Sequence, residues 1–118
     1  MNSIAVISDR PEVVQTLRNV TLPEISDDAE LITFEEVQEA LLEQNDGVDL
    51  VLIDGSNWLG EHGSEHVSGL REIFPNGTIV WFGVGDVYGG ELMDAGANGF
   101  IRQGASLHET VAGISKFL

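Results

Sequence analysis

The sequence contains no cysteine, which excludes disulfide bonds and thiolate metal sites. It also has no apolar run that approaches the length of a membrane span. Residues 1–4 lack the basic and apolar regions of a signal peptide. We therefore expect a soluble, unexported, cytoplasmic protein that does not bind membranes.

Basic residues are scarce: five Lys and Arg stand against twenty Asp and Glu, for a formal net charge of -15. Such a surface repels phosphate backbones, so direct nucleic-acid binding is not expected. The acidic residues are spread along the chain and 42% of residues are apolar, which is not typical of disorder. Diffuse acidity suggests adaptation to high salt, a hypothesis that the KCl dependence of a urea midpoint would test.

The apolar residues concentrate in short runs, of which Leu50 to Ile53 is the clearest. Four consecutive aliphatic residues predict a strand buried on both faces, as in the interior of a parallel sheet. Asp54 follows directly and, as a carboxylate, is expected to emerge at the carboxyl edge of the sheet. Open α/β folds place their ligand sites at that edge.

Apolar strands alternate with helical patterns along the whole chain. The 118 residues suit one domain, 1–118, with strands expected at 4–7, 29–32, 50–53, 79–82 and 99–101. Pro11 is expected in a first helical turn, and the expected N-caps of later helices are Thr33, Ser64 and Ser106. Apolar stripes that include Val20, Leu107 and Leu118 are expected to face the core. This alternation predicts a three-layer α/β/α sandwich around a five-stranded parallel sheet of order 2-1-3-4-5.

That strand order places the topological switch between the first and third strands. Ser8-Asp9 follows the first strand and Asp54 the third, so the two segments become neighbours. Two converging carboxylates, Asp9 and Asp54, favour a divalent cation. The alternatives are that Asp9 caps the helix ahead of Pro11 and that Asp54 caps the following turn.

Three segments resemble the receiver domain of response regulators, the CheY-like superfamily with a flavodoxin-like fold: Val6 to Asp9, Asp49 to Asp54, and Ala95 to Phe100. The resemblance covers essentially the whole chain. It implies that Asp54 accepts a phosphoryl group from a histidine kinase, with Mg²⁺ bound by Asp9, Asp54 and the backbone carbonyl of Ser56. It further implies no enzymatic activity beyond self-phosphorylation and slow autodephosphorylation, and an output domain, a homodimer or another signalling protein as partner.

The sequence departs from this family at the positions that support the chemistry. Ser8 stands in place of an acidic residue, and Gln103 in place of a lysine. The family's hydroxyl residue at the end of the fourth strand falls here on Phe82 or Gly83, and neither has a hydroxyl. Phe100 occupies the position of the family's surface aromatic residue, but the hydroxyl that couples this residue to phosphorylation is missing. Two interpretations follow: Asp54 is phosphorylated with an altered readout, or the domain is a pseudo-receiver that acts by contact alone.

A nucleotide-binding domain is a rival from another class, suggested by Gly83, Gly85 and Gly89. Their spacing has one residue too many for the dinucleotide fingerprint, and they follow the fourth strand rather than the first. His62 and His66 are expected in a solvated loop rather than at a zinc site. The candidate partner surface comprises three aromatic residues: Trp58, Tyr88 and Phe100.

Overall fold

The computed structural model describes residues 3–8, 10–25, 30–34, 48–54, 61–83, 89–104 and 106–118. Its strands form one parallel sheet in the order β2-β1-β3-β4-β5, which confirms the predicted topology. The strands are short, and the interior strands β1, β3 and β4 are mostly apolar and buried, as a sheet covered on both faces requires. The strands are β1 (Ser3–Ile7), β2 (Glu30–Phe34), β3 (Leu50–Asp54), β4 (Thr78–Gly83) and β5 (Gly99–Arg102).

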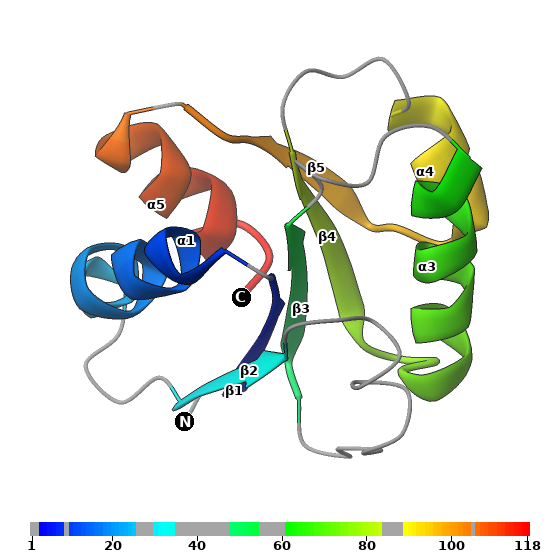
Figure 1. Ribbon diagram of the computed structural model, residues 1–118, viewed down its shortest axis with the longest axis horizontal. Helices are drawn as coiled ribbons and strands as arrows, with labels where there is room; N and C mark the ends of the chain where they lie inside the picture. Colours follow the sequence, from blue (N-terminus) through cyan, green and yellow to red (C-terminus); the bar gives the residue numbers. More distant parts are fainter. Residues whose placement is uncertain are drawn as a thin grey trace.

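Helices cover both faces of the sheet (Figure 1). The first helix continues beyond its α-helical part into a π-helical turn, Leu17–Thr21, and a 3₁₀ turn, Leu22–Glu24. It lies with α5 on one face, whereas α3 and α4 lie on the other, which confirms the three-layer arrangement. The α-helices are α1 (Pro11–Thr16), α3 (Glu61–Ile73), α4 (Gly89–Ala95) and α5 (Leu107–Ser115). Within the described residues, no helix combines the length and apolarity needed to span a membrane.

Strand β3 is the centre of the core, and all five of its residues are buried. Its side chains alternate between the faces: Val51 and Ile53 pack in the α3/α4 layer, and Leu52 in the α1/α5 layer. Each fully buried aliphatic side chain contributes about 1.5–3 kcal/mol. The unbroken apolar run of β3 therefore fixes where Asp54 lies.

Arg71, near the end of α3, joins that helix to the loops beside it. Its guanidinium donates to the carbonyl oxygen of Gly96 at 2.6 Å and to that of Gly77 at 2.7 Å. The Asn98 Oδ1 atom accepts from Arg71 Nη2 at 2.6 Å and from the Ile79 N–H at 2.8 Å. Gly96 has φ 124°, a conformation that glycine adopts without strain. Part of the Ala95 to Phe100 motif thus serves to hold Arg71.

Two predicted helix starts are wrong. Thr33 lies in β2, opposite Val6 of β1, so it does not cap a helix. Ser64 lies inside α3, which begins at Glu61, so His62 and His66 lie on a helix and not in a loop. Both capping patterns are local, and they are overridden here by sheet pairing and by the longer helix. Residues 35–47, where a second helix was predicted, lie outside the described residues.

Three residues of the predicted apolar stripes are substantially exposed: Val20 by 45%, Leu107 by 43% and Leu118 by 40%. Val20 lies in the π-helical turn, where the residue spacing departs from the 3.6-residue period on which the prediction relied. Other predictions at helix ends are confirmed. Pro11 is the first residue of α1, and the Ser106 Oγ atom accepts from the Glu109 N–H at 3.2 Å.

Candidate functional site

Asp54 ends β3 at the carboxyl edge of the sheet, next to the end of β1. The Ser8 hydroxyl, one residue beyond β1, donates to Asp54 Oδ2 at 2.7 Å. This contact confirms that the segments after β1 and β3 meet at the switch point. The Asp54 side chain is nevertheless only 2% exposed, so it is buried in a network of polar groups. Asp9 lies outside the described residues.

Arg10 forms a bidentate ion pair with Asp54. Its Nε donates to Oδ2 at 2.9 Å and its Nη2 to Oδ1 at 3.0 Å, so both carboxylate oxygens are engaged. Arg10 is the N-cap residue of α1, and its own N–H donates to Ser8 Oγ at 3.1 Å. Pro11 fixes the following backbone, so the guanidinium extends from a constrained position. Paired donors in this geometry are among the stronger hydrogen bonds of proteins.

Gln103, in the connection between β5 and α5, completes the network. Its amide nitrogen donates to Asp54 Oδ1 and to the carbonyl oxygen of Phe82, both at 2.7 Å. Its amide oxygen accepts from Arg10 Nη2 at 2.5 Å. A lysine at this position has donors but no acceptor, and its charge would repel the guanidinium. Gln103 therefore suits a site that contains an arginine.

The Asp54 network is closed with respect to hydrogen bonding. Among the side chains that the structure describes, no buried nitrogen or oxygen atom lacks a partner. The guanidinium charge balances that of the Asp54 carboxylate. The ion pair and the hydrogen bonds matter because a buried, unpaired charge costs several kcal/mol.

With Arg10 in place, the described part of the site does not fit Mg²⁺. It offers one carboxylate, and a guanidinium already occupies both of its oxygens. No group of three or more His, Asp or Glu side chains suited to a metal ion occurs among the described residues. A divalent cation at Asp54 would also meet the positive charge of Arg10. The predicted ligand Ser56, like Asp9, lies outside the described ranges.

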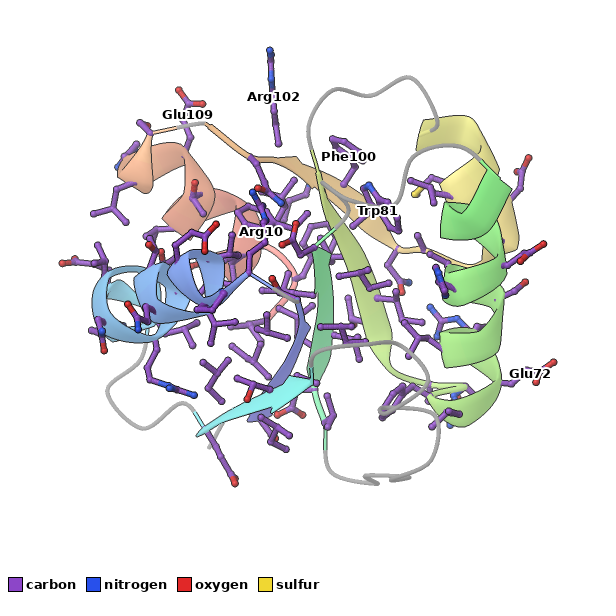
Figure 2. The ribbon with its side chains drawn as sticks, viewed as in Figure 1. Arg10, Glu72, Trp81, Phe100, Arg102 and Glu109 are labelled. Atoms are coloured by element: carbon purple, nitrogen blue, oxygen red, sulfur yellow. The ribbon has the colours of Figure 1, made fainter. Side chains whose placement is uncertain are left out.

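Gly83 ends β4 and is, with Phe82, one of the two positions on which the family's hydroxyl residue was expected to fall. A Cβ atom there would lie 2.5 Å from Trp81 Nε1 and 2.8 Å from Trp81 Cδ1. Trp81 is 5% exposed and belongs to the core, and half-buried Phe100 packs against that cluster. Both aromatic residues lie on the α3/α4 side of the sheet (Figure 2). The indole of Trp81 thus fills the space that a switch hydroxyl would need.

This packing makes the Gly83→Ala variant a test of the Trp81 position. The new methyl group must displace a rigid indole in the core, which is expected to cost about 1–3 kcal/mol of unfolding free energy and to change the tryptophan fluorescence. Gly113→Ala is the matched control. Gly113 lies in α5, where alanine is favoured over glycine, and its new Cβ atom would lie at an ordinary contact distance of 3.5 Å from Ile101. Urea unfolding followed by fluorescence measures both. Equal stability of G83A and wild type would contradict the packing.

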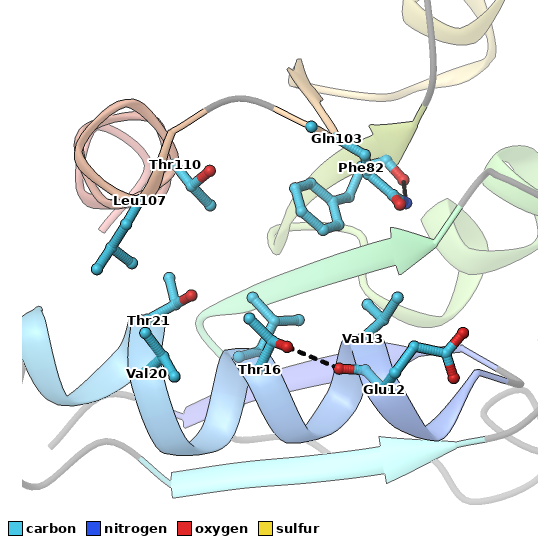
Figure 3. A pocket seen from close by; sticks show the side chains of 11 residues that line it. Glu12, Val13, Thr16, Val20, Thr21, Phe82, Gln103, Leu107 and Thr110 are labelled. Carbon is cyan, nitrogen blue, oxygen red and sulfur yellow. Dashed lines mark hydrogen bonds between the residues drawn. The ribbon is translucent and has the colours of Figure 1, made fainter.

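A cavity of about 320 Å³ opens between α1 and α5 (Figure 3). Its walls include the exposed side chains of Val20 and Leu107, and the π-helical turn supplies part of one side. Gln103 and Phe82 line the cavity and are also hydrogen-bonded to each other in the Asp54 network. The cavity therefore borders the network.

Sequence reasoning identified Ser8, Asp54 and Gln103 but missed Arg10. The available signal was weak: Arg10 is one of only five basic residues, and it directly follows the acidic turn. Phe100 is half-buried, and Gly89 is the first residue of α4. Five other proposed positions lie outside the described residues: Asp9, Ser56, Trp58, Gly85 and Tyr88.

No protein-family model matches the chain, and no curated protein matches its sequence. Solved structures do match its fold. A response regulator from Thermotoga maritima has a TM-score of 0.83 at 21% identity, covering 99% of this chain and 97% of that one. The chemotaxis response regulator CheY4 of Vibrio cholerae has a TM-score of 0.82 at 20% identity, covering 100% and 99%.

A CpaE protein from Burkholderia thailandensis, whose name links it to pilus assembly, also matches. Its TM-score is 0.81 at 14% identity, and the match covers 99% of this chain and 98% of that one. The chain therefore has the CheY-like receiver fold of response regulators, as the sequence motifs predicted. At these identities the likeness establishes the fold alone.

Proposed function

We propose that this chain is a receiver-type signalling domain that acts through protein contacts, with Asp54 serving as a structural anchor rather than as a phosphoacceptor. One observation carries the proposal: Arg10 engages both carboxylate oxygens of Asp54, at 2.9 and 3.0 Å. The partner is a histidine kinase or another signalling protein, and half-buried Phe100 belongs to the proposed contact surface.

Phosphoryl transfer requires a free carboxylate oxygen and a cation that neutralises the charge of the phosphoryl group. Here the oxygens of Asp54 accept from Arg10, Ser8 and Gln103. At least part of this network must open before Asp54 can attack. Gly83 also supplies no hydroxyl to report a bound phosphoryl group, which further favours a contact module.

Phosphorylation of Asp54 is the second candidate function. It is favoured by the position of Asp54 at the carboxyl end of the central strand, beside the segment that follows β1. The nucleotide-binding alternative receives less support, since the Trp81 indole covers the Gly83 backbone that a phosphate would have to approach.

Treatment with acetyl phosphate or beryllofluoride, each with Mg²⁺, distinguishes the two candidates. We expect the intact mass after acetyl phosphate and the amide NMR spectrum after beryllofluoride to remain those of the untreated protein. Asp54→Asn is the negative control, and a receiver domain that accepts phosphate is the positive control for the reagents. A gain of one phosphoryl mass in the wild type, absent from D54N, would overturn the proposed function.

A further inference from the structure

The Arg10 guanidinium is bound by groups from distant parts of the chain. It donates to Asp54 at the end of β3 and to the Gln103 amide oxygen after β5. Its own backbone is tied to Ser8 after β1 through the 3.1 Å bond to the hydroxyl. Arg10 thus joins the carboxyl ends of three strands, contacting the β3 and β5 ends through its guanidinium and the β1 end through its backbone N–H.

The guanidinium is also the more exposed partner of the ion pair. The Arg10 side chain is 29% exposed, whereas the Asp54 side chain is 2% exposed. An ion that approaches along the Arg10 side must displace the guanidinium from Asp54. Ser8 is compatible with this arrangement, because its hydroxyl donates to Asp54 at 2.7 Å and adds no second negative charge.

We propose that Arg10 is the resident cation of this site and that it suppresses a latent divalent-cation site at Asp54. This inference deepens the proposed function and rests on it, since a domain that works by contact alone has no need of a metal. It makes two claims that can be separated. The wild-type protein does not bind Mg²⁺ or Mn²⁺ at Asp54, and a variant that lacks the positive charge at position 10 does.

The first claim is tested by titrating the full chain with Mn²⁺ and recording paramagnetic broadening of amide NMR signals. In the wild type, we expect the signals of Ser8 and Gln103 to broaden no more than those of the surface residues Glu65 and Glu72. Selective broadening at Ser8 and Gln103, absent from Asp54→Asn, would overturn the proposal. This measurement needs no variant at position 10, so it remains decisive even if such variants fail to fold.

The second claim is tested with Arg10→Gln against Arg18→Gln, which removes the same charge from an exposed position. At fixed ionic strength, saturating Mg²⁺ is expected to raise the melting temperature of R10Q by about 5 °C or more relative to R18Q. The double variant R10Q/D54N should lose that gain. Arg10→Lys should resemble the wild type, because it keeps the charge. No Asp54-dependent gain in R10Q would overturn the proposal.

The phosphodonor experiment and the metal titrations test the two proposals separately. Phosphoryl mass on the wild type would overturn the proposed function. Binding of Mn²⁺ at Asp54 without that mass would overturn only the assignment of Arg10 as the resident cation.

Discussion

Replacement of Arg71 with methionine is expected to lower the free energy of unfolding by about 3 kcal/mol. Methionine keeps the unbranched stem but removes the donors that bind Gly77, Gly96 and Asn98. Hydrogen bonds that involve a charged group contribute about 1.5–3 kcal/mol each, and carbonyls left without a partner add a penalty. The expected loss of unfolding free energy is smaller than the summed contributions of the separate hydrogen bonds, because water reaches part of this half-buried site.

Urea unfolding at fixed ionic strength measures the effect as a lower midpoint at an unchanged slope. Arg102→Met is the matched control, since Arg102 is exposed at the end of β5 and its replacement is expected to change stability by no more than about 0.5 kcal/mol. A loss below about 1 kcal/mol in R71M would show that Arg71 does not hold the α3 end to the turn before β5.

The fold was predictable because the signals that determine it are local. The run Leu50 to Ile53 identifies a buried strand without knowledge of its neighbours, and Asp54 follows it by one residue. The alternation of strands and helices then restricts the strand order to few choices. The same reasoning failed at Thr33, whose capping pattern is local but whose pairing with Val6 of β1 is not.

The Asp54 network was only partly predictable, because its bonds join residues far apart in sequence. Asp54 is 44 positions from Arg10 and 49 from Gln103. Each residue type has many alternatives when it is considered alone, and an arginine at a helix N-cap indicates no particular partner. Family resemblance treated Ser8 and Gln103 as separate losses, whereas the structure shows both bound to Asp54.

These departures form one chemical set. A carboxylate at position 8 would add a second negative charge beside Asp54, and a lysine at position 103 would add a positive charge beside Arg10. Ser8 donates to Asp54 without a charge, and Gln103 both donates to Asp54 and accepts from Arg10. Among the residues of the network that the structure describes, the Arg10–Asp54 ion pair therefore balances the charge. Restoring either family residue alone is expected to unbalance it.

The strength of that ion pair is best measured by a double-mutant cycle with Arg10→Gln and Asp54→Asn. R10Q leaves a buried carboxylate without its cation and is expected to cost about 3–5 kcal/mol. D54N leaves a partly exposed guanidinium without its carboxylate and should cost less, about 1–2 kcal/mol. The double variant removes both charges, so its loss should fall short of the sum by at least about 1.5 kcal/mol.

Urea unfolding of the four proteins at neutral pH gives this coupling energy. A second cycle with Arg18→Gln and Asp54→Asn is the control, because Arg18 is an exposed residue of the π-helical turn. Its effects are expected to add within about 0.5 kcal/mol. Additive losses in the Arg10 cycle would mean that the guanidinium does not stabilise the Asp54 carboxylate in solution. In that case the carboxylate would be free of its internal cation, and phosphorylation would become the better explanation of the site.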